Sequence, residues 1–163
     1  MRWDELDAES CSVARAISVI GDRWTLMILR DCFQRVRRFE EFEQRLGITR
    51  HILSDRLRKL VRLGVLERVP YQKRPPRHEY RLTRKGLDLH PVILALVAWG
   101  DTHMAGRRGA PFLLEHRCGH VFHAVATCSE CGEAVAPRDV RMRLGPGAPR
   151  KAARLITKVQ ATG

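Results

Sequence analysis

The sequence predicts a mainly helical fold with one small β-hairpin, followed by a short cysteine-containing segment. Three observations lead to this prediction. Apolar residues recur at helical spacing between residues 11 and 63, strand-like alternation follows over 65–82, and three of the five cysteines lie between 118 and 131. A chain of 163 residues has room for one domain with a small appendage. We expect the main domain at 1–108, the cysteine-containing segment at 112–137 and a basic, disordered tail at 138–163.

Three helices are expected ahead of residue 48. The first covers 11–20 and stops at Gly21, after which Asp22 can cap the second. The second helix should bury one apolar face, made of Trp24, Met27, Ile28 and Cys32. A short third helix ends at Gly47, and its apolar side chains share one face: Phe39, Phe42 and Leu46.

A fourth helix is expected at 49–63, and its two faces differ in character. Leu53, Leu57 and Leu60 fall within a narrow sector that would pack on the core, whereas the opposite face is polar and cationic. A solvated surface would look the same, but the third helix and the glycine-containing turn complete a helix-turn-helix pattern. The residues of this helix that would reach DNA are Thr49, Arg50, His51, Ser54 and Arg58.

The alternation over 65–82 predicts a hairpin around a basic, proline-rich loop at 72–77. A solubilising loop is the plain explanation, but cations beside an arginine-rich helix favour contact with phosphates or the minor groove. The predicted contacts are Lys73, Arg74 and Arg77. A hairpin placed directly after such a helix is a wing, so the expected fold class is a winged helix-turn-helix domain with a small C-terminal segment.

The charge distribution supports a polyanionic partner. The chain carries a net charge of +12, of which +9 lies in residues 49–85 and +6 in residues 138–163. Residues 1–48 and 86–137 are slightly acidic. An evenly charged soluble surface would not be divided in this way, so we expect double-stranded DNA as the partner. A membrane is disfavoured because the longest apolar run, 92–99, is too short to span a bilayer. The chain shows no signal peptide, and we expect a cytoplasmic protein.

A further helical stretch begins after Thr83, is interrupted near Pro91 and continues to Met104. Between Pro91 and Gly100 this stretch is apolar almost all round. A small domain can bury only part of such a surface, so we expect a two-fold homodimer interface here. Packing under the N-terminal helix is the alternative.

The cysteine-containing segment resembles half of a zinc ribbon. Cys128 and Cys131 form a Cys-x-x-Cys-Gly knuckle, and Cys118 offers a third thiolate. Three cysteines and one histidine would complete a closed, structural zinc site, with His116 preferred as the fourth ligand over His120. A redox dithiol, or a knuckle that has lost its metal, is the alternative. A catalytic deaminase site would need a His-x-Glu motif, which the chain lacks, so we do not expect an enzyme.

Cys11 has two interpretations. A helical cysteine is usually a small buried hydrophobe, but near a helix N-terminus the helix dipole favours its thiolate, which is the condition for redox sensing. The sequence alone favours the first interpretation and leaves the second open.

Six ordered motifs resemble the HxlR-type winged helix-turn-helix regulators, relatives of the MarR group, over residues 11–104. The motifs are Cys11 to Ile17, Ile20 to Leu26, Arg38 to Phe42, Leu53 to Leu57, Leu82 to Leu87, and Ala98 to Gly100. The resemblance implies a dimer whose terminal helices pack together, with the 49–63 helix in the major groove and the 65–82 hairpin as the wing. Such proteins are mostly repressors that respond to small molecules or reactive electrophiles, and some sense oxidants at the position of Cys11. Ser12 stands where the family commonly has proline, and the zinc-knuckle extension resembles one found in a subset of the family.

The sequence therefore predicts a homodimeric, sequence-specific DNA-binding transcriptional regulator, more often a repressor than an activator, with an oxidant or small molecule as its effector. An RNA-binding or protein-interaction module built around the C-terminal zinc knuckle is the alternative. The low aromatic content of 6% leaves few platforms on which bases could stack, and this disfavours RNA.

Overall fold

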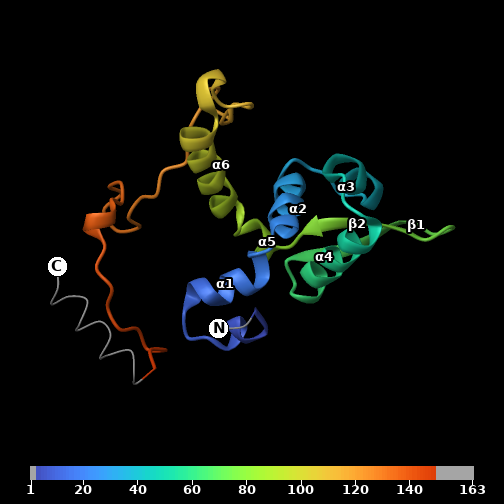
Figure 1. Ribbon diagram of the computed structural model, residues 1–163, viewed down its shortest axis with the longest axis horizontal. Coiled ribbons are helices and arrows are strands. Elements are labelled where there is room, and N and C mark those ends of the chain that lie inside the picture. The colour runs from blue at the N-terminus through green and yellow to red at the C-terminus, as the bar shows by residue number, and fades with distance from the viewer. Residues whose placement is uncertain (1–2, 150–163) are drawn as a thin grey trace. The chain divides into compact units, whose positions relative to one another are not determined.

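The computed structural model describes residues 3–149, which divide into two compact units (Figure 1). One unit consists of residues 19–124, and the other contains residues 3–18 and 125–149. The boundary after residue 124 falls inside the segment 112–137 that the sequence assigns to one piece. Of the expected tail, residues 138–149 are described, and residues 150–163 lie outside the described part of the chain.

The first four α-helices agree with the sequence prediction. They are α1 (Ser12–Ile20), α2 (Arg23–Phe33), α3 (Phe39–Leu46) and α4 (Arg50–Arg62), preceded by a short 3₁₀ turn at Trp3–Ala8. Asp22 caps α2 by accepting a hydrogen bond from the Thr25 N–H at 3.0 Å, and Thr49 caps α4 in the same way through Ile52. Helix α3 ends at Gly47, whose φ of 61° lies in the left-handed region that favours glycine. Local capping chemistry therefore sets these boundaries.

Helix α2 ends in a motif that the sequence does not announce. Arg35 has a φ of 67°, a conformation usually left to glycine, and its N–H donates to Cys32 O. The N–H of Val36 donates to Asp31 O, which completes a Schellman motif. Val36 is buried, so its apolar contact offsets the backbone cost of Arg35.

Two antiparallel strands, β1 (Leu66–Gln72) and β2 (Arg77–Leu82), form the predicted hairpin, with Leu66 opposite Leu82. The hairpin is fixed to the start of α3. Arg38 forms a β-bridge with Glu79, and the Tyr80 N–H donates to Arg37 O at 2.8 Å. Figure 1 shows the hairpin projecting past α3 and α4. Its base is therefore rigidly attached, while its tip reaches outward.

The predicted helical stretch after Thr83 is two helices, α5 (Arg84–Leu87) and α6 (His90–Met104). Short 3₁₀ turns follow at Gly106–Arg108 and Pro137–Asp139. Gly86 lets α5 approach the backbone of Val65, directly before β1, because a Cβ there would lie 2.3 Å from Val65 O. Within residues 3–149, no helix is long and apolar enough to cross a membrane.

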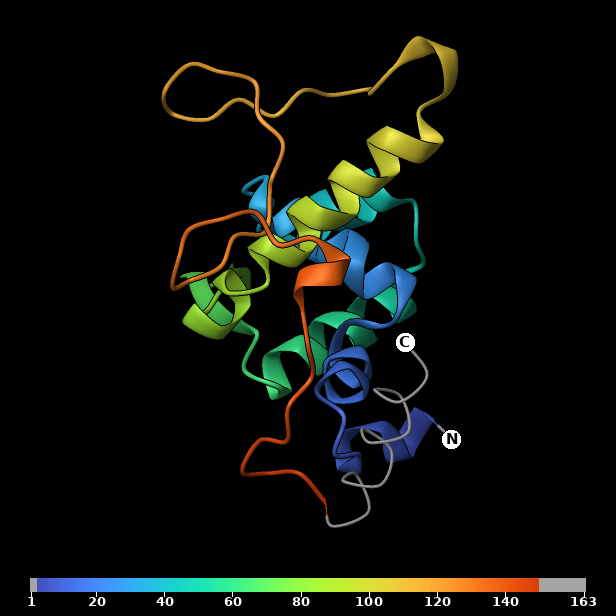
Figure 2. The ribbon, with the colours of Figure 1, turned by 90° about the vertical axis from the view of Figure 1, so that its left-hand side faces the viewer.

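Helix α2 is the centre of the core. It packs against α3, α4 and α6, and Figure 2 shows it between α6 and α4. Ile28 and Leu29 are fully buried and Cys32 nearly so, whereas Trp24 is only half-buried and Met27 is 36% exposed. The predicted burial of Met27 is therefore wrong. With three helices packed on α2, the buried arc turns toward Thr25 and Leu29, and Met27 falls on the far side.

Candidate nucleic-acid interface

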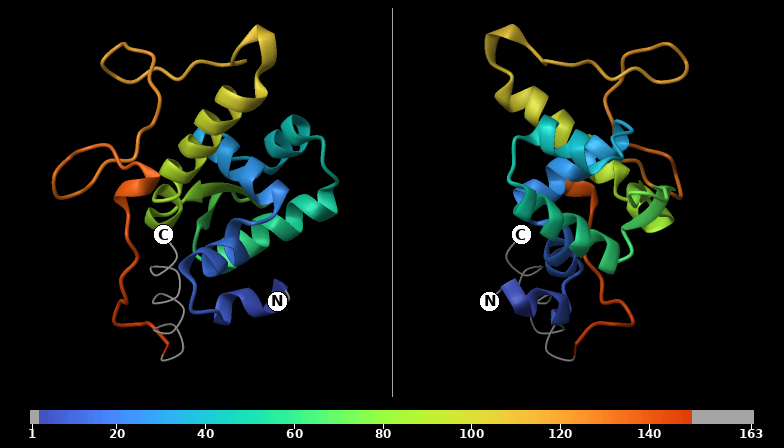
Figure 3. Two further views of the ribbon diagram at one scale, coloured as in Figure 1. Left: turned by 60° about the vertical axis from the view of Figure 1, so that its left-hand side comes forward. Right: turned by 90° about the vertical axis from the view of Figure 1, so that its right-hand side faces the viewer.

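Helix α4 has one face in the core and one face in solvent. Leu53, Leu57 and Leu60 are fully buried, as the sequence predicts. The predicted DNA-contacting side chains lie on the other face: those of Arg50, His51 and Arg58 are 67%, 84% and 70% exposed. Thr49 is exposed and Ser54 is half-buried. Figure 3 shows the chain leave α3, turn and return as α4, which is the helix-turn-helix connection.

Arg50 and Arg58 on this outer face each have an acidic neighbour. Arg50 donates to Glu43 at 2.7 Å, and its guanidinium lies 4.9 Å from the centre of the Phe39 ring. Asp55 pairs with Arg58 and lies 3.4 Å from His51. Exposed pairs of this kind contribute about 1 kcal/mol or less, so a phosphate can displace the acid at little cost.

The next turn of α4 carries a concentration of positive charge. Arg56, Arg58, Lys59 and Arg62 line one groove together with Asp55. Burial and the nearby Arg56 lower the pKa of Lys59, an effect that Asp22 opposes and Arg62 strengthens. The groove is consequently a surface where a bound anion would relieve repulsion between cations.

The hairpin supplies a second cationic surface. Lys73, Arg74 and Arg77 are exposed in and beside the turn that joins the strands. Sequence reasoning missed two further cations: Arg68 contacts His78 at 3.0 Å, and Arg38 lies 4.8 Å from the Tyr71 ring. A groove connects the start of α3 with the hairpin and is lined by Phe39, Glu40, Arg68, Tyr71, Pro76, Arg77, His78 and Tyr80. Arg68 could have been found as a cation on the expected strand, but the position of Arg38 depends on a contact between distant parts of the chain.

An ion pair joins α4 to the start of α2. Arg56 Nε donates to Asp22 Oδ1 at 2.9 Å, while the same carboxylate caps α2. Partial burial acts to raise the pKa of Asp22, but hydrogen bonds from Arg56 and the Thr25 N–H outweigh it, and the pKa lies below its ordinary value. One carboxylate thus holds the N-terminus of α2 and the middle of α4 together.

Comparison with known proteins identifies this arrangement. Residues 19–108 match the model of the HxlR-like helix-turn-helix family. The chain belongs to this family. It is accordingly a DNA-binding transcriptional regulator rather than an enzyme.

Relatives of this HxlR-like regulator extend the similarity beyond the family domain. An uncharacterised HTH-type transcriptional regulator of Mycobacterium tuberculosis (strain CDC 1551 / Oshkosh) is 47% identical over 89% of this chain and 92% of its own length. The crystal structure of the candidate transcription factor PA1607 matches with a TM-score of 0.76 and 36% identity, covering 84% of this chain and 96% of that one. The redox regulator HypR in its reduced form matches with a TM-score of 0.54 and 32% identity, covering 56% of this chain and 92% of that one.

The cysteines of the HxlR-like regulator lie in contrasting surroundings. Cys32 is buried. Its burial, together with the nearby charge of Asp31, raises the pKa of its thiol to about 12, so this thiol is unreactive at neutral pH. Cys11 is exposed immediately before α1, and its carbonyl accepts the N–H of Arg15. The expectation of a buried hydrophobe at Cys11 is therefore wrong, and its redox role stays a prediction.

The predicted zinc ligands form two separate pairs. His116 Nδ1 lies 3.2 Å from Cys118 Sγ in the unit 19–124, and Cys128 and Cys131 adjoin each other in the other unit. Backbone N–H groups of Cys131 and Glu130 lower the pKa of Cys128. Among the described residues, no three His, Cys, Asp or Glu side chains gather as a metal ion would require. The structure describes each pair by itself, so the zinc site stays a prediction.

Replacing Arg56 with glutamine should destabilise the protein by about 1 kcal/mol or less at pH 7, because the Asp22 carboxylate loses its partner. Since the pKa of Asp22 is lowered by folding, this contribution is present above its unfolded pKa of about 3.9 and is lost as pH falls through the lower folded value. Urea denaturation at pH 7 and at a pH below the folded pKa of Asp22 measures both effects.

Arg58→Gln is the matched control for this measurement, because Arg58 lies on the same helix with an exposed partner. Its effect on stability should stay within about 0.5 kcal/mol. A loss for Arg56→Gln that is equal at both pH values would contradict the role given to Asp22.

Proposed function

We propose that the protein is a cytoplasmic, homodimeric, sequence-specific repressor that places α4 in the major groove of DNA and the β1–β2 hairpin against the backbone or minor groove. The observation that carries this proposal is the division of α4 into a fully buried leucine face and an exposed cationic face beside the cationic hairpin. A simple solvated surface would not require cations on both neighbouring elements.

The two surfaces would have different tasks. Arg50 lies in the first turn of α4 and Arg58 two turns later, positions from which side chains can reach base edges. Thr49, His51 and Ser54 would also contact bases or phosphates. Lys73, Arg74 and Arg77 would hold phosphates or enter the minor groove, where they position the protein without specifying the sequence.

Arg58→Ala should weaken binding to the protein's own upstream DNA by roughly 1–3 kcal/mol if Arg58 contacts a guanine. Fluorescence anisotropy over a range of salt concentrations, with a random duplex beside the specific one, measures this loss. Arg107 is an exposed arginine outside α4 and the hairpin, so Arg107→Ala is the control and should change binding less than twofold. Equal losses on both duplexes would reassign Arg58 to a phosphate, and tighter binding to single-stranded RNA would favour the alternative function.

Helix α6 has three faces in different surroundings, and the homodimer is proposed from the exposed one. Ile93 is buried against the core, and Leu94, Val97 and Ala98 are covered by residues 110–124 of the same chain. Val92, Leu96 and Trp99 stay exposed at 41%, 47% and 60%. Their spacing of four and three residues places them in one stripe, which suits packing against the same stripe of a second copy.

Leu96→Glu should convert the dimer into a monomer, because a carboxylate would be buried at the two-fold contact. Sedimentation equilibrium on the full chain measures the mass. Leu87→Glu is a matched control, since Leu87 lies on α5 and is 49% exposed. A monomeric wild-type protein, or a Leu96→Glu dimer as tight as the wild type, would contradict this interface.

For the effector we propose an oxidant that reacts with Cys11, supported by the exposure of this thiol and by the similarity to the redox regulator HypR. Mild peroxide should change operator affinity at least threefold in the wild type and leave Cys11→Ser unchanged, with Cys32→Ser responding like the wild type. A response that persists in Cys11→Ser would exclude this cysteine as the sensor.

A further inference from the structure

A groove within the unit 19–124 lies between the end of α2 and β2, and we call it the α2–β2 groove. It has a volume of about 320 Å³, at the lower end of the range for small-molecule sites. At roughly 30 Å³ for each group the size of a water molecule, this volume has room for about ten non-hydrogen atoms. The groove has a largely apolar lining: Cys32, Phe33, Val36, Tyr80, Leu82 and Leu87.

The charged side chains of the groove are mainly positive. Arg35 and Arg37 line it from the loop after α2 and Arg81 lines it from β2, against one acid, Glu67. Arg81 already donates to Glu79 at 3.0 Å. Among residues 3–149, by contrast, no carboxylate pairs with the guanidinium of Arg35 or Arg37. Two arginines without an acid beside an apolar lining suit an anion that has an apolar body.

Arg35 occupies a backbone position that favours glycine. Its φ of 67° lies in the left-handed region, where a side chain costs free energy. The buried contact of Val36 offsets this cost, but glycine at position 35 would allow the same contact. The fold therefore gains nothing from an arginine here, and its guanidinium is free to serve a ligand.

The backbone of β2 adds a hydrogen-bond donor. The Tyr80 N–H donates away from β1, to Arg37 O, whereas the Thr83 N–H donates toward Val65 O, directly before β1. Because successive N–H groups of a strand point to opposite sides, the N–H of Leu82 points away from β1, as that of Tyr80 does. In the described part of the chain, no residue outside the hairpin accepts a hydrogen bond from this N–H. A carboxylate can accept bonds from such an N–H and from guanidinium groups together.

The negative groups near the groove are already balanced. Carbonyls of the last turn of α2 accept hydrogen bonds from the N–H groups of Arg35 and Val36. Glu67 lies opposite Arg81 in the hairpin. One negative charge on a ligand is therefore accommodated, whereas Glu67 would repel a second one.

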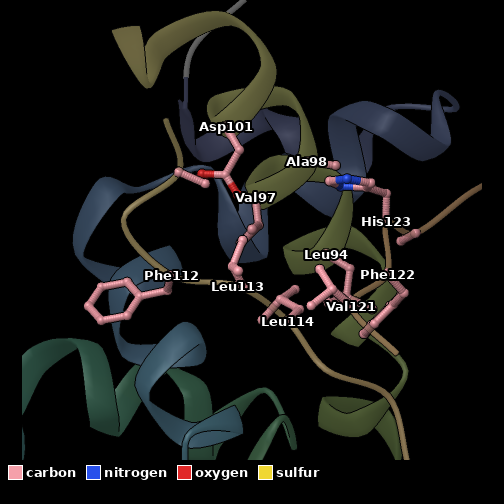
Figure 4. Close-up of a pocket in the computed structure, with 12 residues that line it drawn as sticks. Leu94, Val97, Ala98, Asp101, Phe112, Leu113, Leu114, Val121, Phe122 and His123 are labelled. Atoms are coloured by element: carbon pink, nitrogen blue, oxygen red, sulfur yellow. The ribbon is translucent and has the colours of Figure 1, made fainter. Parts of the chain in front are cut away.

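A pocket between α6 and residues 110–124 does not suit such a ligand. Its volume is about 30 Å³, which is room for about one water molecule (Figure 4). The acid Asp101 lines this pocket, and neither arginine nor lysine does. An organic anion would therefore select the α2–β2 groove.

We propose that the α2–β2 groove binds an amphipathic monocarboxylate, an aliphatic acid of about ten non-hydrogen atoms, and that this ligand is an effector of the regulator. The carboxylate accepts hydrogen bonds from Arg35, Arg37 and the Leu82 N–H, and the chain covers Val36 and Leu87. The ligand thereby joins the loop before α3 to β2 and alters how the hairpin is held beside α3. The effector role rests on the proposed DNA binding, whereas the binding of the carboxylate does not.

Isothermal titration calorimetry of the full chain with octanoate should show one site per chain, with a dissociation constant below about 1 mM. Octanamide has the same chain without the charge and should bind at least tenfold more weakly. Arg35→Gly and Arg37→Gln should each weaken octanoate binding at least fivefold. Arg84 is an exposed arginine of α5 outside the groove, so Arg84→Gln is the matched control and should stay within twofold.

Arg35→Gly separates ligand binding from folding. Its melting temperature should be equal to or above that of the wild type, because glycine suits the φ at this position. Amide NMR of the wild type adds a readout that needs no variant: octanoate should move the Leu82 N–H signal.

Saturating octanoate should also change operator affinity at least threefold in the wild type and leave Arg35→Gly unchanged. A protein that binds octanoate but no DNA would refute the proposed function while supporting this site. Octanoate binding with unchanged operator affinity would overturn the effector role.

Three results would overturn the site itself. One is the lack of saturable octanoate binding. Another is equal affinity for octanoate and octanamide, which would make the groove a merely apolar surface. The third is weaker operator binding by Arg35→Gly in the absence of octanoate, which would assign Arg35 to a DNA phosphate.

Discussion

The buried carboxylate of Asp31 is the interaction on which the arrangement of the DNA-binding unit depends. Its side chain is fully buried on the central helix α2, and it accepts hydrogen bonds from Arg30 at 2.7 and 2.9 Å and from Arg45 of α3 at 3.3 Å. A buried charge is tolerated only with such partners, and removing one commonly costs about 3–5 kcal/mol. The requirement to pair Asp31 therefore fixes α3 against α2. Because Asp22 at the other end of α2 holds Arg56 of α4, one helix determines the positions of both members of the helix-turn-helix.

The exposed ion pairs have a different role from these anchoring pairs. Glu43 and Asp55 hold Arg50 and Arg58 on the solvent side of α4, where the attraction is weak and screened by salt. Such pairs reduce the conformational entropy that the arginines would lose on binding, yet yield easily to a phosphate or a guanine. The anchoring acids stay in place while the surface acids can be exchanged. If Arg50 and Arg58 contact DNA as proposed, stability and DNA recognition use separate sets of charges on the same three helices.

The parts of the fold that could be predicted from sequence are those set by local chemistry. Asp22, Thr49 and Thr83 cap helices within three residues of themselves, and the leucine spacing of α4 gives its buried face directly. The burial of Met27 is mispredicted because the buried arc of α2 depends on where α6 packs, which lies some 65 residues away in the chain. The bridge between Arg38 and Glu79 is equally non-local, so the position of Arg38 beside the hairpin was missed. The exposed residues of α4 and the hairpin were found because amphipathic spacing reports exposure even where partners are unknown.

Helix α6 connects the separate functions of the chain, because each of its faces is assigned to a different neighbour. Ile93 joins the core that holds α2, while Leu94 and Val97 line a small pocket with residues from 110–124. Leu96 and Trp99 remain exposed, and in the proposed homodimer they would contact a second copy. In a dimer formed through the last face, the spacing of the two α4 helices would follow from the crossing of the two α6 helices, and half-site spacing on DNA would follow in turn. A change in residues 110–124 that shifts α6 would therefore alter DNA binding through the dimer geometry, without altering any residue of α4.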